Sequence, residues 1–87
     1  MKFHITEHAK KRLRQWGIEK PNKAMGLTLL GKKGMRRIYR TMGIKIKRVP
    51  DTVYLLRGDT VYVCQPIKPK EYLLLTAYKL VSKIVFS

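Results

Sequence analysis

The residues that most constrain the fold are two short runs of β-branched and aromatic side chains, 52–56 and 60–64. The link between them, Arg57-Gly58-Asp59, contains a glycine, and two such runs around a short turn predict a β-hairpin. After a connection at 66–69, the Leu-rich run 71–78 predicts a last strand. The C-terminal half of the chain is therefore expected to be mainly β-sheet.

Residues 35–47 show apolar and polar side chains in alternation. A period of two predicts strand structure, either one long strand or two short ones with a bend or bulge at Gly43. Pro50 and Asp51 are expected to form a turn. The apolar segment 80–87 is also β-prone, and it leaves open an edge strand, a short helix or a segment that packs on a partner.

The N-terminal part of the chain has helical periodicity. Residues 6–16 predict a helix with Thr6 as N-cap and Gly17 as a left-handed C-terminal residue. One apolar stripe of this helix is expected to face the core, and it consists of Ile5, Ala9, Leu13 and Trp16. A second helix is expected to begin near 19–21 and to end at the glycines and lysines of 31–34.

These elements predict an α+β domain in which two N-terminal helices pack on one face of a four-stranded antiparallel sheet, with the other face open. Residues 1–87 are too few for two cores, so a single domain is expected. The sequence shows neither the features of a signal peptide nor a run of about 20 apolar residues. The chain is therefore expected to be cytoplasmic and not to enter a membrane.

Positive charge is concentrated in the first half of the sequence. The formal net charge is +15, and residues 1–49 carry fifteen Lys or Arg against two acidic residues. A field this strong and lopsided predicts a polyanionic partner, and nucleic acid is the commonest polyanion that a small basic protein meets.

No metal or cofactor is expected from the sequence. Cys64 is the only cysteine and lies in the apolar run 61–64, which favours a small buried side chain over a zinc ligand. The five acidic residues are spread along the chain. Two-metal nucleases need clustered carboxylates, so such a site is not expected.

His8 is the leading candidate for chemistry, although helix histidines are more often merely solvated. Metal-free RNA cleavage needs a base for the 2′-hydroxyl proton, an acid for the leaving oxygen and cations around the phosphate. His8 has the chemistry of the base or the acid. Arg12, one helical turn away, is suited to stabilise charge on the phosphate.

A second candidate group lies in the last predicted strand. Regular alternation places Tyr72, Leu74, Thr76 and Tyr78 on one face, so that the hydroxyls of Thr76 and Tyr78 point to the same side. Two hydroxyls in that position can orient a phosphate or donate a proton. Strand propensity alone explains the same residue types.

Further residues are candidates for RNA contact. Cations that can reach phosphates are Lys11, Arg14, Arg40, Lys45, Lys47 and Arg57. Tyr39, Tyr54 and Tyr62 lie among basic residues, and aromatic rings beside cations are typical of single-strand binding. Cross-strand packing is the alternative role for these tyrosines.

Two segments resemble a known family. Residues 5–18, which read ITEHAKKRLRQWGI, resemble the opening S/T-x-H-A-x-x-R-x-x-x-R-G-I of a widespread family of small bacterial and archaeal domains. Residues 59–64 and 72–78 are similar to its last two strands, which finish in T-x-Y. That family is grouped with the RelE, barnase, EndoU and colicin-type ribonucleases, many of them toxins that cleave RNA without a metal.

The resemblance implies a RelE/barnase-like domain with His8, Arg12, Thr76 and Tyr78 as catalytic residues. The chain departs from the family pattern at Trp16, where the family has the arginine that precedes the glycine. The implied function is a metal-independent endoribonuclease, the toxin of a toxin–antitoxin pair. RNA, the ribosome and an acidic antitoxin protein are the implied partners.

Two other functions stay open. One is a non-catalytic nucleic-acid-binding protein on the same fold, and the other is a basic adaptor that docks on an acidic protein or a ribosome surface. Replacing His8 by Ala distinguishes the enzyme from the non-catalytic binder. The binder should lose little affinity, because a neutral imidazole adds little to phosphate affinity.

Overall fold

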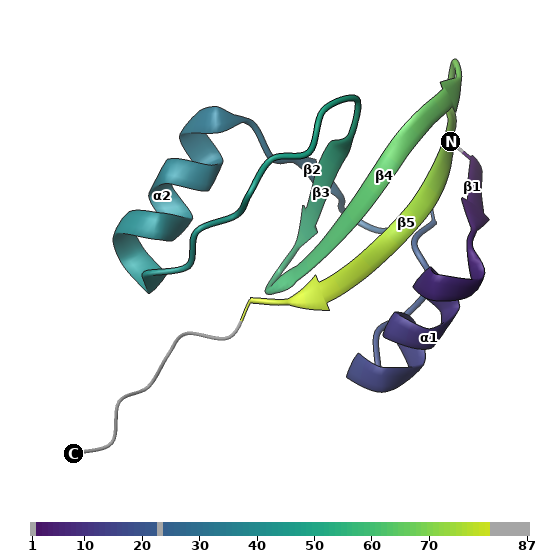
Figure 1. Ribbon diagram of the computed structural model, residues 1–87, viewed down its shortest axis with the longest axis horizontal. Coiled ribbons are helices and arrows are strands. Elements are labelled where there is room, and N and C mark those ends of the chain that lie inside the picture. The colour runs from purple at the N-terminus through teal and green to yellow at the C-terminus, as the bar shows by residue number, and fades with distance from the viewer. Residues whose placement is uncertain (1, 23, 81–87) are drawn as a thin grey trace.

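The computed structural model describes residues 2–22 and 24–80, which form an α+β domain (Figure 1). Within these residues the elements in chain order are β1 (Lys2–Ile5), α1 (Glu7–Trp16), β2 (Thr28–Leu29), α2 (Lys32–Met42), β3 (Val53–Arg57), β4 (Thr60–Lys68) and β5 (Glu71–Lys79). Neither helix has the length and apolar character that crossing a membrane requires.

The sheet is mixed, with five strands in the order β1-β5-β4-β3-β2. β1 runs parallel to β5, and the other neighbours are antiparallel. The predicted hairpin is confirmed as β3 and β4, and the last predicted strand as β5. The expectation of four antiparallel strands is wrong because the edge strands β1 and β2, with four and two residues, are too short to show a periodic pattern.

The first predicted helix is confirmed with both its caps. The Thr6 hydroxyl accepts a hydrogen bond from the Ala9 amide at 3.1 Å, and Gly17 has a left-handed φ of 63°. Ala9 and Leu13 are buried against the sheet as expected. Trp16 is the exception, because its side chain lies outside the core and is 36% exposed.

The second helix lies elsewhere than predicted. Residues 19–22 and 24–30 are irregular except for β2, and the predicted strand region begins with α2. The reason is that one residue pattern satisfies two periods: Met35, Ile38 and Met42 form a helical stripe, and they pack with the core as such. Gly43, at a φ of 71°, ends this helix as a C-cap and not as a bend between strands.

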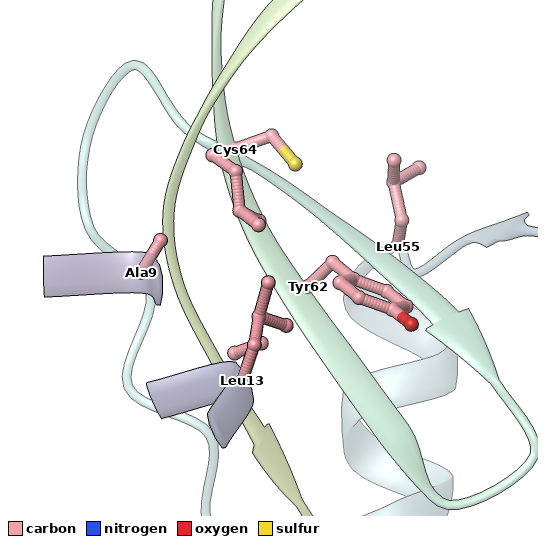
Figure 2. Close-up of a cluster of buried hydrophobic side chains, with 7 residues drawn as sticks. Ala9, Leu13, Leu55, Tyr62 and Cys64 are labelled. Atoms are coloured by element: carbon pink, nitrogen blue, oxygen red, sulfur yellow. The ribbon is translucent and has the colours of Figure 1, made fainter. Parts of the chain in front are cut away.

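The two helices cover opposite faces of the sheet, so the expectation of helices on one face is wrong. On the α1 side, Ala9 and Leu13 pack with Tyr62, Cys64 and residues of β3 and β5 (Figure 2). On the α2 side, a second cluster is built from Leu30, Ile38, Tyr54, Val61, Val63 and Leu80. Each face of the sheet therefore has its own core, although the end of β4 at residues 65–68 is exposed.

A β-bulge changes which side chains of β5 share a face. The register shifts between Val63 and Cys64, so that Thr76 is opposite Val63 while Leu74 is opposite Cys64. Leu74 consequently belongs to the α1 side, and Tyr78 packs on the α2 side. The predicted common face for Tyr72, Leu74, Thr76 and Tyr78 is wrong, because a bulge inserts one residue and reverses the alternation beyond it.

Candidate nucleic-acid interface

The first candidate pair, His8 and Arg12, lies on α1 beside its buried stripe, and Arg12 is half-buried. His8 is exposed, and the Arg12 guanidinium donates a hydrogen bond to the Gln15 side chain at 3.1 Å. Lys11 and Arg14 are also exposed on this helix. Arg14 borders a small pocket of about 350 Å³ together with Lys10 and Lys20.

The second candidate pair lies across the sheet from α1. Thr76 is opposite Val63 and Tyr78 is opposite Val61, and both of these valines belong to the core under α2. Burial raises the pKa of the Tyr78 phenol, so this hydroxyl stays protonated near neutral pH. The structure therefore does not bring the pair in β5 together with His8 and Arg12, because the sheet separates them.

Arg57 has an ion-pair partner. Its guanidinium lies 3.1 Å from a Glu19 carboxylate oxygen, and the Tyr62 hydroxyl donates to the Glu19 backbone carbonyl at 2.7 Å. Burial raises the pKa of Tyr62, which keeps this donor protonated. The contacts tie the chain after α1 to the hairpin, so Arg57 is placed for a structural role.

The largest gathering of cations lies on α2 and on the chain that follows it. We call it the basic surface, and it consists of Lys32, Lys33, Arg36, Arg37, Arg40, Lys45, Lys47 and Arg48. All of these side chains are exposed. Of the predicted RNA contacts, Arg40 lies in α2 and Lys45 and Lys47 in the irregular segment after it, so none of the three is in a strand.

Acidic residues are missing from this part of the sequence. Between Glu19 and Asp51 the chain contains neither Asp nor Glu. Within residues 2–22 and 24–80, the ion pairs involve His4, Lys10 and Arg57, none of which belongs to the basic surface. The acid-free stretch is the sequence signal that could have identified the whole surface, including the five cations that were not predicted.

The segment after α2 is held by hydrogen bonds to Tyr54 and by Ile44 and Ile46, which pack on the core of the α2 side. Gly43 reverses the chain, and its amide donates to the Tyr39 carbonyl at 2.9 Å. The buried Tyr54 hydroxyl donates to the Lys47 carbonyl and accepts from the Val49 amide, each at 3.0 Å. These contacts fix the segment 44–49, and with it the cations that it carries.

A pocket of about 570 Å³ lies between α2 and this segment. Its lining residues are Met35, Arg36, Tyr39, Arg40, Lys45 and Ile46. Of the three tyrosines considered for stacking, Tyr39 is 59% exposed, whereas Tyr54 and Tyr62 are buried in the two cores. Only Tyr39 among them is accessible to a ligand.

Cys64 is fully buried, as predicted, and burial raises the pKa of its thiol to about 12. Among the described residues, no three His, Cys, Asp or Glu side chains come together as metal ligands would.

Comparisons with protein-family models, with curated proteins and with solved structures found no match to this chain.

Proposed function

We propose that the protein binds RNA through the basic surface. The observation that carries the proposal is the gathering of eight exposed cations on α2 and the segment after it, with no acidic residue between Glu19 and Asp51. Protein cations held close together gain affinity for nucleic acid by releasing the counterions condensed on the phosphates. A cation cluster that served internal ion pairs would be interleaved with carboxylates.

The proposal is for binding without cleavage. General acid–base catalysis requires the base, the acid and the charge-stabilising cation around one phosphate. His8 and Arg12 lie on α1, which packs on one side of the sheet, whereas Thr76 and Tyr78 lie on the other side, opposite Val63 and Val61. This separation favours the non-catalytic binder over the metal-independent endoribonuclease as the function of the fold.

The test is the salt dependence of RNA affinity. We expect the logarithm of the association constant for a single-stranded 12-nucleotide RNA to fall linearly with the logarithm of salt concentration, with a slope of about −3 to −5 for four to six phosphate contacts. Fluorescence anisotropy titrations between 50 and about 300 mM salt measure this slope. A flat response contradicts the proposal.

Matched variants locate the surface. Replacement of Lys32, Lys33 and Arg37 by Gln should make the slope shallower by about 2, because each phosphate contact contributes about 0.7. The control replaces Lys2, Lys68 and Lys70 by Gln, which removes the same charge from exposed positions around the β4–β5 turn. Equal losses in both variants would mean that net charge, and not the basic surface, carries the affinity.

A further inference from the structure

The pocket between α2 and the segment 44–46 combines two kinds of lining. Met35 and Ile46 are half-buried and pack against the core on the α2 side, so the pocket has an apolar floor that is continuous with the interior. Arg36, Arg40 and Lys45 line the same pocket and are exposed. A ligand that satisfies both parts needs an apolar body and negative charge beside it.

Tyr39 supplies an aromatic ring at this pocket. Its neighbours in the lining, Arg36 and Arg40, lie three residues before it and one residue after it on α2. A stacking platform flanked by guanidinium groups is the arrangement by which proteins hold single-stranded nucleic acid. The bases of a duplex are paired and stacked internally, so a duplex offers this pocket only its phosphates.

We propose that this pocket binds one unpaired nucleobase of RNA, stacked on Tyr39, with the flanking phosphates on Arg36, Arg40 and Lys45. This inference rests on the proposed function and names the form of RNA that the protein prefers. A volume of about 570 Å³ lies within the range of small-ligand sites, so the pocket has room for one base. The α2 wall spans only residues 35–40, too short to hold an acidic amphipathic helix along several turns.

The pocket is preorganised by its attachment to the sheet. The Tyr54 hydroxyl bonds to the backbone at Lys47 and Val49, directly after the wall formed by Lys45 and Ile46. Because Tyr54 is itself buried at 3% exposure, the wall is held before any ligand binds. Preorganisation reduces the ordering cost of binding.

The test compares single-stranded and duplex RNA on the same variant. Tyr39→Ala should lower affinity for a 12-nucleotide single strand by about 5- to 100-fold, the effect of losing one stacked base. Affinity for an RNA hairpin duplex with the same number of phosphates should change less than about twofold, since phosphate contacts remain. Tyr39→Phe, which keeps the ring, should retain single-strand affinity.

Two controls make the result specific. Trp16→Ala removes another exposed aromatic ring that does not line the pocket, and it should leave single-strand affinity unchanged. A 2-aminopurine in the single strand should be quenched by the wild-type protein and by Tyr39→Phe but not by Tyr39→Ala. Circular dichroism should show that each variant is folded.

The outcomes separate this inference from the proposed function. Suppose that the wild-type protein binds RNA with a steep salt slope, but Tyr39→Ala lowers affinity for single-stranded and duplex RNA equally, or lowers neither. The inference of a nucleobase pocket is then wrong, and the proposal for the basic surface stands. If an acidic helical peptide displaces the quenched strand while polyuridylate does not, the pocket belongs to a protein partner and the inference is overturned. Absence of salt-dependent RNA binding overturns both.

Discussion

The tyrosines Tyr39, Tyr54 and Tyr62 stand in similar basic and β-prone sequence, yet their exposures are 59%, 3% and 1%. Tyr54 and Tyr62 lie on opposite faces of the hairpin, and each hydroxyl donates to one backbone carbonyl of an irregular segment, that of Lys47 or that of Glu19. Tyr39 lies on a helix that was predicted to be a strand. At the scale of one residue, function therefore depends on the element that carries it.

His8 has a direct test of its own. We expect labelled RNA incubated with the protein in EDTA to stay intact over hours, because the residues needed around one phosphate lie on two sides of the sheet. Gel electrophoresis of the RNA measures this. Cleavage that is lost in His8→Ala, with RNA affinity retained, would restore the endoribonuclease, and Thr76→Ala would show whether β5 takes part.

Because of Cys64, we expect the free energy of unfolding to fall at alkaline pH. An unfolded thiol titrates near 9 and the folded one near 12, so only the unfolded state gains by ionising between these values. The stability contributed by the neutral thiol is fully present below pH 9 and is lost as pH rises toward 12, by about 1.4 kcal/mol per pH unit. Urea denaturation at pH 8 and pH 10 measures the loss. It should be smaller in Cys64→Ala, where only the raised pKa values of buried groups such as Tyr62 and Tyr78 remain. Equal pH dependence in both proteins would contradict it.

At the scale of elements, the sequence predicted those that carry their own boundary signals. Thr6 and Gly17 cap α1, and the Gly58 turn joins β3 to β4, so local chemistry suffices for both. α2 was missed because its N-cap, Gly31, has no capping side chain and its first turn has no acidic residue. Ile38 and Met42 also fit a period of two with Ile44 and Ile46, whereas the helix adds Met35 to its stripe and packs on the cluster that contains Tyr54.

The segment after α2 is an element without regular structure, and its order is expected to depend on Tyr54. Tyr54→Phe leaves the Lys47 carbonyl and the Val49 amide without their partner, at a cost of about 1–3 kcal/mol in unfolding free energy. Faster hydrogen exchange at the Val49 amide should accompany the loss. The exposed Tyr39→Phe is the matched control and should change neither quantity. An unchanged exchange rate in Tyr54→Phe would show that other contacts hold the segment.

At the scale of the whole molecule, the charge asymmetry was readable from the sequence but its placement was not. The basic half contributes α1 on one side of the sheet and α2 on the other, so its cations are divided between the two sides. The four proposed catalytic residues are divided for the same reason. The face that a helix covers depends on long-range packing. The spacing of His8 and Arg12 within one helix carries no information about that packing.

The parallel pairing of β1 with β5 has a consequence for the order in which the protein folds. His4 and Glu71 are in contact across this pair although they are 67 residues apart in the sequence. Turns joining neighbouring strands let β3, β4 and β5 form early, whereas closing so long a loop is slow. On the ribosome, residues 2–16 emerge long before the strand that receives them. We therefore expect the N-terminal strand and its helix to be the last part of the nascent chain to dock.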